Sequence, residues 1–198
     1  MDQYFTDSQP DPAPPDQKRS SSQRFLLDML ETLLLSAAIF LVLNFISARI
    51  RIESVSMQPT LYENDFVLVN RLAYKLGQPS RGDVIVFHYP GGAPDAEPYI
   101  KRVVGLPGDF IEVKDRQVFV NGNPTHEPYI KEAPTYTGNW RVPEGSLFVL
   151  GDNRNNSSDS HAWGYVPLEN VIGTAKVVYL PPSHWKSLVI NNVQAAGP

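Results

Sequence analysis

The sequence predicts a mainly β protein in which a single N-terminal transmembrane helix precedes an antiparallel-β domain. Three observations lead to this prediction. Residues 32–48, TLLLSAAIFLVLNFISA, carry no charge and are just long enough to cross a bilayer. The chain after them holds short runs rich in Val, Ile and Phe, broken by Gly, Pro, Asp and Asn. The 18 prolines and 13 glycines also favour a turn-rich β protein over a helical one.

The N-terminal part divides into a polar tail and an apolar segment. Residues 1–24 are rich in Pro, Asp and Ser, so we expect a disordered tail. Residues 25–48 are apolar apart from a few polar positions such as Asp28 and predict a membrane anchor. A cleaved signal peptide would need an unusually long leader, and cleavage after Ala48 would place bulky Ile46 where a small residue is required. A buried core helix is the remaining alternative. Basic residues stand on both sides, so charge alone does not orient the segment.

Six later segments have the composition of β-strands. They cover residues 65–70, 83–89, 99–105, 110–122, 146–151 and 171–180. Within the fourth, KDRQ separates two strand-like runs and predicts a hairpin turn. Residues 90–98 are expected to form a surface loop. We therefore assign residues 52–193 to one β-rich domain and expect residues 194–198 to be frayed.

The composition excludes several classes of function. The chain has no cysteine, which rules out a disulfide framework, a thiol nucleophile and cysteine-ligated zinc. The net charge is −4 with no basic stripe, so no nucleic-acid partner is expected. No His or carboxylate cluster has the spacing of metal ligands, so neither a metal nor an organic cofactor is implied.

The segment ESVSMQPTL, residues 53–61, follows the apolar segment closely and holds two hydroxyls. Ser54 and Ser56 share one parity on an extended chain, so their side chains point the same way. One hydroxyl can attack a carbonyl carbon while the other donates a hydrogen bond to the oxyanion. Pairs of serines are also common in turns and helix caps, so this pattern is weak when taken alone.

A serine nucleophile needs a base, and the sequence offers two. Of the four histidines only His161 lies in a polar cluster, GDNRNNSSDSHAWG, so a Ser/His/Asp arrangement is conceivable. Lys101 lies between apolar residues in a predicted strand, where burial would lower its pKa and yield a neutral amine. A lysine on an edge strand facing water is the alternative. In the polar cluster, Asp159 and Arg154 can pair and hold Ser157 or Ser158 against the amine, or the loop can simply be solvated.

Together these segments resemble the bacterial type I signal peptidases, which are membrane-anchored serine proteases with a Ser–Lys dyad. The similar segments occur in the family's order behind an N-terminal anchor. They are SVSMQPTL (54–61), NDFVLVNRLAY (64–74), RGDVIVFHYP (81–90), YIKRVVGLPGD (99–109) and GDNRNNSSDSHAWGYVP (151–167). The single anchor and the compact size are closer to cyanobacterial, thylakoid or Gram-positive members. The resemblance implies a catalytic domain of the signal peptidase and LexA-like type.

The resemblance also implies a role for each site residue. Ser56 is the nucleophile and Lys101 the general base. The Ser56 backbone N–H and the Ser54 hydroxyl form the oxyanion hole. Supporting roles fall to Ser157, which holds the amine, and to Asp159, Arg154 and Arg102. Shallow pockets, which admit small side chains at the first and third positions before the cut, would be lined by Ile52, Met57, Tyr99 and Ile100.

The implied setting is a cell or thylakoid membrane, with the N-terminus cytoplasmic and the catalytic domain on the extracytoplasmic side. The implied partners are preprotein signal peptides, the lipid bilayer and, by proximity, the secretion machinery. A nucleophile just past the enzyme's own anchor would lie near the height at which the scissile bond of a translocated preprotein emerges. Tryptophans at positions 140, 163 and 185 are candidates for contact with lipid, or for the core.

The chain departs from the family pattern at three positions, and two other functions stay open. Val55 stands where many members have Gly, His161 where enterobacterial members tend to have Arg, and Asn155 where some have Asp. A Ser–Lys self-cleaving protease of the repressor type would need a DNA-binding N-terminal domain in place of the tail and anchor. A membrane-tethered, non-catalytic β domain that binds extended peptides is the other alternative.

Overall fold

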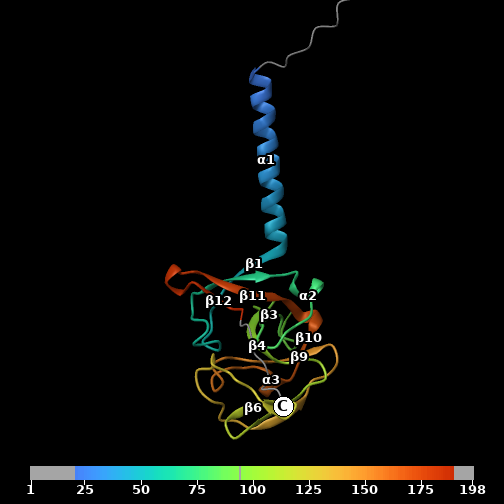
Figure 1. The fold of residues 1–198 in the computed structure, drawn as a ribbon, viewed down its shortest axis with the longest axis vertical. Helices are drawn as coiled ribbons and strands as arrows, with labels where there is room; N and C mark the ends of the chain where they lie inside the picture. Colours follow the sequence, from blue (N-terminus) through green and yellow to red (C-terminus); the bar gives the residue numbers. More distant parts are fainter. Residues whose placement is uncertain (1–20, 94, 190–198) are drawn as a thin grey trace, which may run out of the picture. The chain divides into compact units, whose positions relative to one another are not determined.

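The computed structural model describes residues 21–93 and 95–189, and Figure 1 shows their fold. Helix α1 spans Ser21–Ile46 and forms, up to Val42, a unit separate from the rest of the chain. At about 1.5 Å per residue, its 26 residues exceed the roughly 30 Å of a bilayer's hydrocarbon core. The most apolar part of this helix, within Ser22–Ile46, has no residue buried against the rest of the protein. These observations argue against a buried core helix.

Two hydroxyl groups in α1 are satisfied by the helix itself. The Thr32 hydroxyl donates to the Asp28 carbonyl at 2.8 Å, and the Ser36 hydroxyl donates to the Thr32 carbonyl at 2.7 Å. Internal pairing of this kind suits a helix surrounded by lipid, because the hydrocarbon offers polar groups no partners.

The ends of the predicted anchor need correction. Most of the predicted disordered tail lies outside the described residues, but residues 21–24 are helical. The predicted anchor ran to residue 48, whereas α1 ends at Ile46 and strand β1, Ser47–Arg51, follows. The alternation of residues 47–51 explains the strand, because Ala48 and Ile50 pack against the core while Arg49 and Arg51 are exposed. The predicted frayed end, residues 194–198, lies outside the described residues, as do residues 190–193 of the predicted domain.

The described β-strands form two antiparallel sheets. The larger has the order β1-β2-β11-β3-β4-β9-β10, with β12 also paired to β11. Its strands are β1, β2 (Phe66–Asn70), β3 (Val84–Phe87), β4 (Tyr99–Gly105), β9 (Ser146–Leu150), β10 (Val166–Pro167), β11 (Val171–Leu180) and β12 (Lys186–Ser187). The helical elements of this unit are short: α2 (Ala73–Leu76), α3 (Ser160–Trp163), η1 (Leu168–Asn170) and η2 (Pro182–His184). The predicted mainly β fold is thereby confirmed.

The smaller sheet has the order β7-β6-β5-β8, with β5 at Phe110–Lys114, β6 at Gln117–Val120, β7 at Asn123–Pro124 and β8 at Gly138–Arg141. The predicted hairpin turn is confirmed, since Lys114 pairs with Gln117 across a two-residue loop. Both loop residues, Asp115 and Arg116, have positive φ angles of 50° and 61°, as a type I′ turn requires. Strand β8 was not predicted, because its sequence GNWR lacks β-branched residues.

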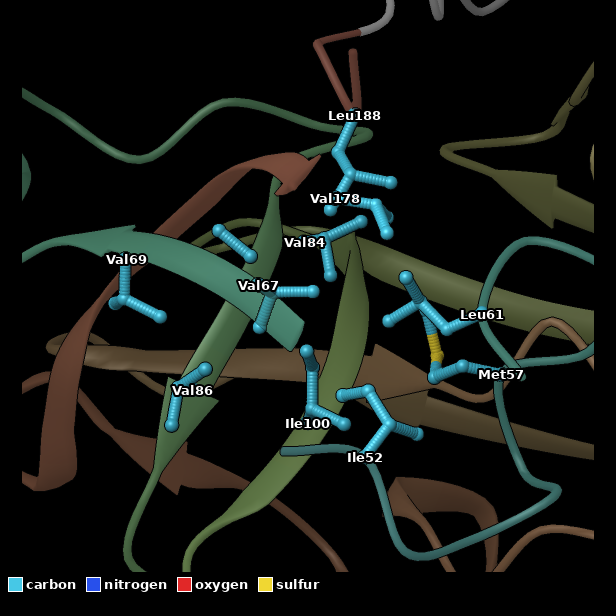
Figure 2. Packing of buried hydrophobic residues seen from close by; sticks show 11 residues of the cluster. Ile52, Met57, Leu61, Val67, Val69, Val84, Val86, Ile100, Val178 and Leu188 are labelled. Atoms are coloured by element: carbon cyan, nitrogen blue, oxygen red, sulfur yellow. The ribbon is translucent and has the colours of Figure 1, made fainter. Parts of the chain in front are cut away.

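The larger sheet contributes most of a core that supports the site. One cluster of buried residues joins Ile52, Met57 and Leu61 to Ile100 of β4, and Figure 2 shows these side chains converging. The segment that carries Ser56 is thus fixed by apolar residues on both sides of it. Of the three tryptophans, Trp140 and Trp163 pack against core clusters, whereas Trp185 is 70% exposed.

Candidate active site

The segment after β1 places the two serine hydroxyls together. The Ile52 N–H donates to the Asp65 carbonyl at 2.8 Å, which fixes the start of the segment beside β2. The hydroxyl oxygens of Ser54 and Ser56 lie 3.2 Å apart, and they meet because the chain bends at Val55 and enters a turn at Ser56 rather than staying extended as predicted. In the described part of the chain, the backbone N–H of Ser56 donates to no other group. Two donors are therefore available beside the Ser56 hydroxyl.

Strand β4 brings Lys101 to Ser56. The Lys101 Nζ lies 2.8 Å from the Ser56 Oγ and 3.0 Å from the Ile100 carbonyl oxygen, and the side chain is only 4% exposed. Burial lowers the pKa of the Lys101 ammonium to about 8, although the carboxylates of Asp159 and Asp152 act in the opposite direction. The alternative of an edge-strand lysine facing water is wrong. No comparable contact joins His161 to Ser56 among the described residues, which disfavours a Ser/His pair.

The polar loop after β9 holds the segment that carries Ser56 from the other side. The backbone N–H of Asn153 donates to the Ser56 carbonyl at 3.0 Å, and the Asn153 side-chain amide donates to the Val55 carbonyl at 3.1 Å. The backbone N–H of Gly151 donates to the Asp159 carboxylate at 2.9 Å. The loop is therefore not simply solvated, because its polar groups fix the backbone around Ser56.

Asp159 is fully buried and has a histidine partner. The Nδ1 of His161 lies 2.6 Å from the Asp159 carboxylate, and the imidazole stacks on the Tyr136 ring at 4.0 Å between centroids. The predicted pairing of Asp159 with Arg154 is wrong, because Arg154 binds Glu127 instead. The departure at position 161 thus leaves the carboxylate with an ionisable partner.

Two buried arginines anchor the loop. Arg102 binds Asp152 with two hydrogen bonds of 2.8 and 2.6 Å, and the ring of Tyr129 covers its guanidinium at 4.0 Å. Arg154 binds Glu127 with two hydrogen bonds of 2.6 and 2.8 Å. Loss of one partner would leave a buried charge unpaired, which costs roughly 3–5 kcal/mol. Arg102 and Arg154 were predicted as supporting residues, but their partners Glu127 and Tyr129 were missed.

Asn155 shows why an amide suits its position. Its side-chain oxygen accepts hydrogen bonds from the N–H and hydroxyl of Thr135, at 2.9 and 3.0 Å. Its side-chain nitrogen donates to the Ala133 carbonyl at 3.1 Å. An Asp could not make this last bond, so the departure from some relatives matches the local partners.

A cleft of about 380 Å³ opens onto the dyad. Among its lining residues are Ser54, Ser56, Lys101, Ile52, Tyr99 and Ile100. Met57, which was also predicted to contact substrate, is fully buried in the core and does not line this cleft, so its contact with substrate stays a prediction. The Ser157 hydroxyl is buried and has no hydrogen-bond partner among the described residues, so its predicted bond to Lys101 also stays a prediction.

The fold and the site define a class of protein: a β-rich domain behind an apolar helix, with a serine hydroxyl hydrogen-bonded to a buried lysine amine in an open cleft. Comparison with known proteins identifies the family. The model of the family described as signal peptidase, peptidase S26, matches residues 26–180. The chain therefore belongs to the signal peptidase family.

The similar proteins are consistent with this assignment. A signal peptidase I of Leptolyngbya laminosa is 42% identical over 177 residues, covering 86% of this chain and 87% of that protein. A probable signal peptidase I-1 of Synechocystis is 41% identical over 175 residues, covering 85% and 89%. A chloroplastic thylakoidal processing peptidase 1 of Arabidopsis thaliana is 39% identical over 141 residues, covering 67% and 42%. The resemblance to signal peptidases seen in the sequence is confirmed.

Proposed function

We propose that the protein is a membrane-anchored serine endopeptidase that removes signal peptides from translocated preproteins, with Ser56 as nucleophile and Lys101 as general base. The observation that carries the assignment of roles is the 2.8 Å contact between the Lys101 Nζ and the Ser56 Oγ in a buried environment. Family membership supports the reaction itself.

The proposed reaction begins with a neutral amine. In this step one N–H of the neutral Lys101 donates to the Ile100 carbonyl, and the nitrogen lone pair accepts a hydrogen bond from the Ser56 hydroxyl, 2.8 Å away. The hydroxyl gives its proton to the amine as its oxygen attacks the carbonyl carbon of the scissile peptide. The Ser56 N–H and the Ser54 hydroxyl stabilise the oxyanion. Lys101 then returns the proton to the leaving amine as the peptide C–N bond breaks. A water molecule, deprotonated by the same lysine, attacks the acyl-enzyme, and Lys101 gives this proton to the Ser56 oxygen as the ester bond breaks.

The cleft supports binding of an extended peptide. Ile52 lines it together with Tyr99 and Ile100, the first two residues of β4. A substrate in the extended conformation can therefore lie along the start of β4 and direct its side chains to alternate sides. Acceptance of only small residues at the first and third positions before the cut is part of the proposal.

The placement in the membrane is also proposed. Helix α1 supplies the anchor. The second compact unit of the chain, which begins at Leu43 in the last turn of α1, carries Ser56 and Lys101 and is called the catalytic unit below. In the proposed topology the N-terminus is cytoplasmic and the catalytic unit lies on the extracytoplasmic side of the cell or thylakoid membrane. Protease protection of sealed vesicles, read with antibodies against each end of the chain, tests this orientation.

The direct test is cleavage of a precursor peptide with Ala at the first and third positions before the cut. Ser56→Ala and Lys101→Ala should each abolish cleavage, while both variants keep the thermal unfolding midpoint within a few degrees. Ser56→Ala removes the attacking oxygen, and Lys101→Ala removes the base. Full activity of Lys101→Ala combined with loss in His161→Ala would instead assign the base to His161. A peptide that binds but is never cut by the unmodified protein would favour the non-catalytic alternative.

The pH dependence follows from the lysine. Because the pKa of Lys101 lies at about 8, the fraction of neutral amine rises as the pH increases toward that value. We expect kcat/KM to rise about tenfold per pH unit below pH 7 and to level off above about pH 8. A pH–rate profile that is flat from pH 5 to 9 would contradict a lysine base.

A further inference from the structure

A second cleft, of about 270 Å³, lies in the catalytic unit, and none of its lining residues lines the cleft at the dyad. Phe45, Arg71, Lys75, His88, Glu169 and Ile172 are among the residues around it. The cleft thus brings together the end of α1, the segment after β2, helix α2 and the start of β11. The proposed reaction gives these residues no role.

Two cationic side chains of the cleft, Arg71 and Lys75, have no carboxylate partner among the described residues. The side chains of Arg71 and Lys75 are exposed, and within residues 21–93 and 95–189 neither forms an ion pair. Glu169 is the carboxylate of the cleft lining, and it too forms no ion pair in the described residues. Arg71 and Lys75 thus place two cations in the lining against the single carboxylate of Glu169, so the cleft favours an anion.

The cleft also adjoins the end of the anchor. The Arg71 N–H donates to the Ile46 carbonyl, the last residue of α1, at 2.9 Å, and Phe45 lines the cleft. If α1 spans the bilayer, these residues lie where the lipid head groups are. Leu76, next to Lys75, is 84% exposed, and an apolar side chain flanked by cations is typical of segments that bind a membrane surface.

We propose that this cleft binds the phosphate of an anionic phospholipid head group, with Arg71 and Lys75 contacting the phosphate and Leu76 entering the acyl region. The proposal rests on the proposed membrane anchoring. Three observations support it: the uncompensated cations, the position at the end of α1, and the exposed leucine beside them. A bound head group would tie the catalytic unit to the membrane surface at a second point besides the anchor.

The test measures lipid binding to the full chain by native mass spectrometry, so it does not depend on peptidase activity. The chain is purified in a neutral detergent, and phosphatidylglycerol or phosphatidylcholine is titrated into the micelles. The informative variant is Arg71→Gln/Lys75→Gln. The matched control, Arg116→Gln/Lys131→Gln, removes the same charge from exposed positions at the β5–β6 turn and the loop after β7.

We expect a phosphatidylglycerol adduct on the unmodified chain that is at least tenfold more abundant than the phosphatidylcholine adduct. Arg71→Gln/Lys75→Gln should weaken phosphatidylglycerol binding about 30-fold, since each cation near an anionic surface contributes about fivefold. The control variant should bind as the unmodified chain does, and all three proteins should cleave the precursor peptide in detergent.

Equal binding of phosphatidylglycerol by the variant and the control would overturn the proposal. Displacement of the lipid by low millimolar inorganic phosphate would identify a site for free phosphate instead and would also overturn it. A chain that binds lipid as expected but cleaves no precursor would contradict the proposed function while leaving this site intact.

Discussion

At the scale of single residues, the site depends on a lysine whose charge is controlled by its surroundings. Lys101 is desolvated, while Asp159 and Asp152 favour its protonated form. Arg102 offsets the charge of Asp152 through two hydrogen bonds. His161 is the side-chain partner of Asp159, at 2.6 Å, and this contact is an ion pair only when the imidazole is protonated. We therefore expect the charge state of Lys101 to depend on His161, which does not contact it.

Substitution of His161 should move the pH profile. His161→Gln removes a group that can be cationic, so Asp159 acts on Lys101 without compensation and raises the pKa of the amine. The rise of kcat/KM with pH should then shift upward by about 0.5 to 1 pH unit. His161→Arg supplies a permanent cation and should shift the rise in the opposite direction or leave it in place. Measuring kcat/KM from pH 5 to 10 for all three proteins decides this. A drop in rate with no shift for Gln would mean that His161 serves only the structure of the loop.

Gly151 illustrates a residue whose absent side chain matters. A Cβ on Gly151 would overlap the Ser157 hydroxyl and approach the Ser56 carbonyl oxygen within 2.5 Å. We expect Gly151→Ala to displace the backbone of Ser56 and to reduce kcat by about 100-fold or more, because small misplacements of reacting groups are costly. KM should change little. Gly122→Ala is a control for a glycine with no atom within 4 Å of the added Cβ, although its positive φ of 83° will cost some stability. Normal kcat in Gly151→Ala would show that the loop tolerates a shift there.

Much of the site can be predicted from the sequence, and the reason is local. The close spacing of Ser54 and Ser56 and the apolar neighbours of Lys101 are visible in a few adjacent residues. Glu127 and Tyr129 could not be found in this way, because they lie in an irregular segment with no periodicity, and only the tertiary fold brings them to Arg154 and Arg102. The partner of Asp159, His161, could not be identified from the sequence either, because the loop holds several charged residues that allow several pairings.

At the scale of elements, the strands with β-branched residues were predicted within one or two residues, whereas short or polar strands were not. Strands β2, β3, β4, β9 and β11 fall within the predicted segments. The first two residues of β1, Ser47 and Ala48, were assigned to the anchor because they continue the apolar segment, although the alternation from Ala48 to Arg51 indicates a strand. Strands of two residues, such as β7, are defined by their partners alone and leave no pattern in the sequence.

The β5–β6 hairpin allows a test of element stability. Asp115 and Arg116 adopt positive φ angles that cost energy for residues with a side chain, whereas Asn-Gly suits this turn. Asp115→Asn/Arg116→Gly should therefore stabilise the protein by about 1 kcal/mol. The denaturant midpoint should rise at constant m-value. Gln117→Gly, a glycine placed in the adjoining strand, should instead destabilise by roughly 0.5–1 kcal/mol. A lower midpoint for the Asn-Gly variant would show that the side chains at the turn make contacts worth more than the strain.

At the scale of the whole molecule, the anchor and the catalytic unit have different requirements. The catalytic unit has buried clusters of its own, whereas the span in α1 buries no side chain within the protein. Folding of the catalytic unit should therefore not require α1. In the proposed topology, α1 would instead raise the effective concentration of the enzyme at the membrane, where a precursor's own apolar segment is also confined.

Removal of residues 1–42 tests this division. We expect the shortened protein to keep the thermal unfolding midpoint of the full chain within about 3 °C and to cleave a soluble precursor peptide within a few-fold of the full rate. Cleavage of a precursor inserted in vesicles should fall by about 100-fold, because the shortened enzyme must reach the membrane-bound precursor from solution instead of meeting it within the membrane. A variant in which residues 21–42 are replaced by an unrelated apolar helix of the same length should restore that cleavage. If the unrelated helix fails while the native one succeeds, α1 recognises the precursor directly rather than only confining the enzyme. An unfolded shortened protein would mean that the catalytic unit depends on α1 for its stability.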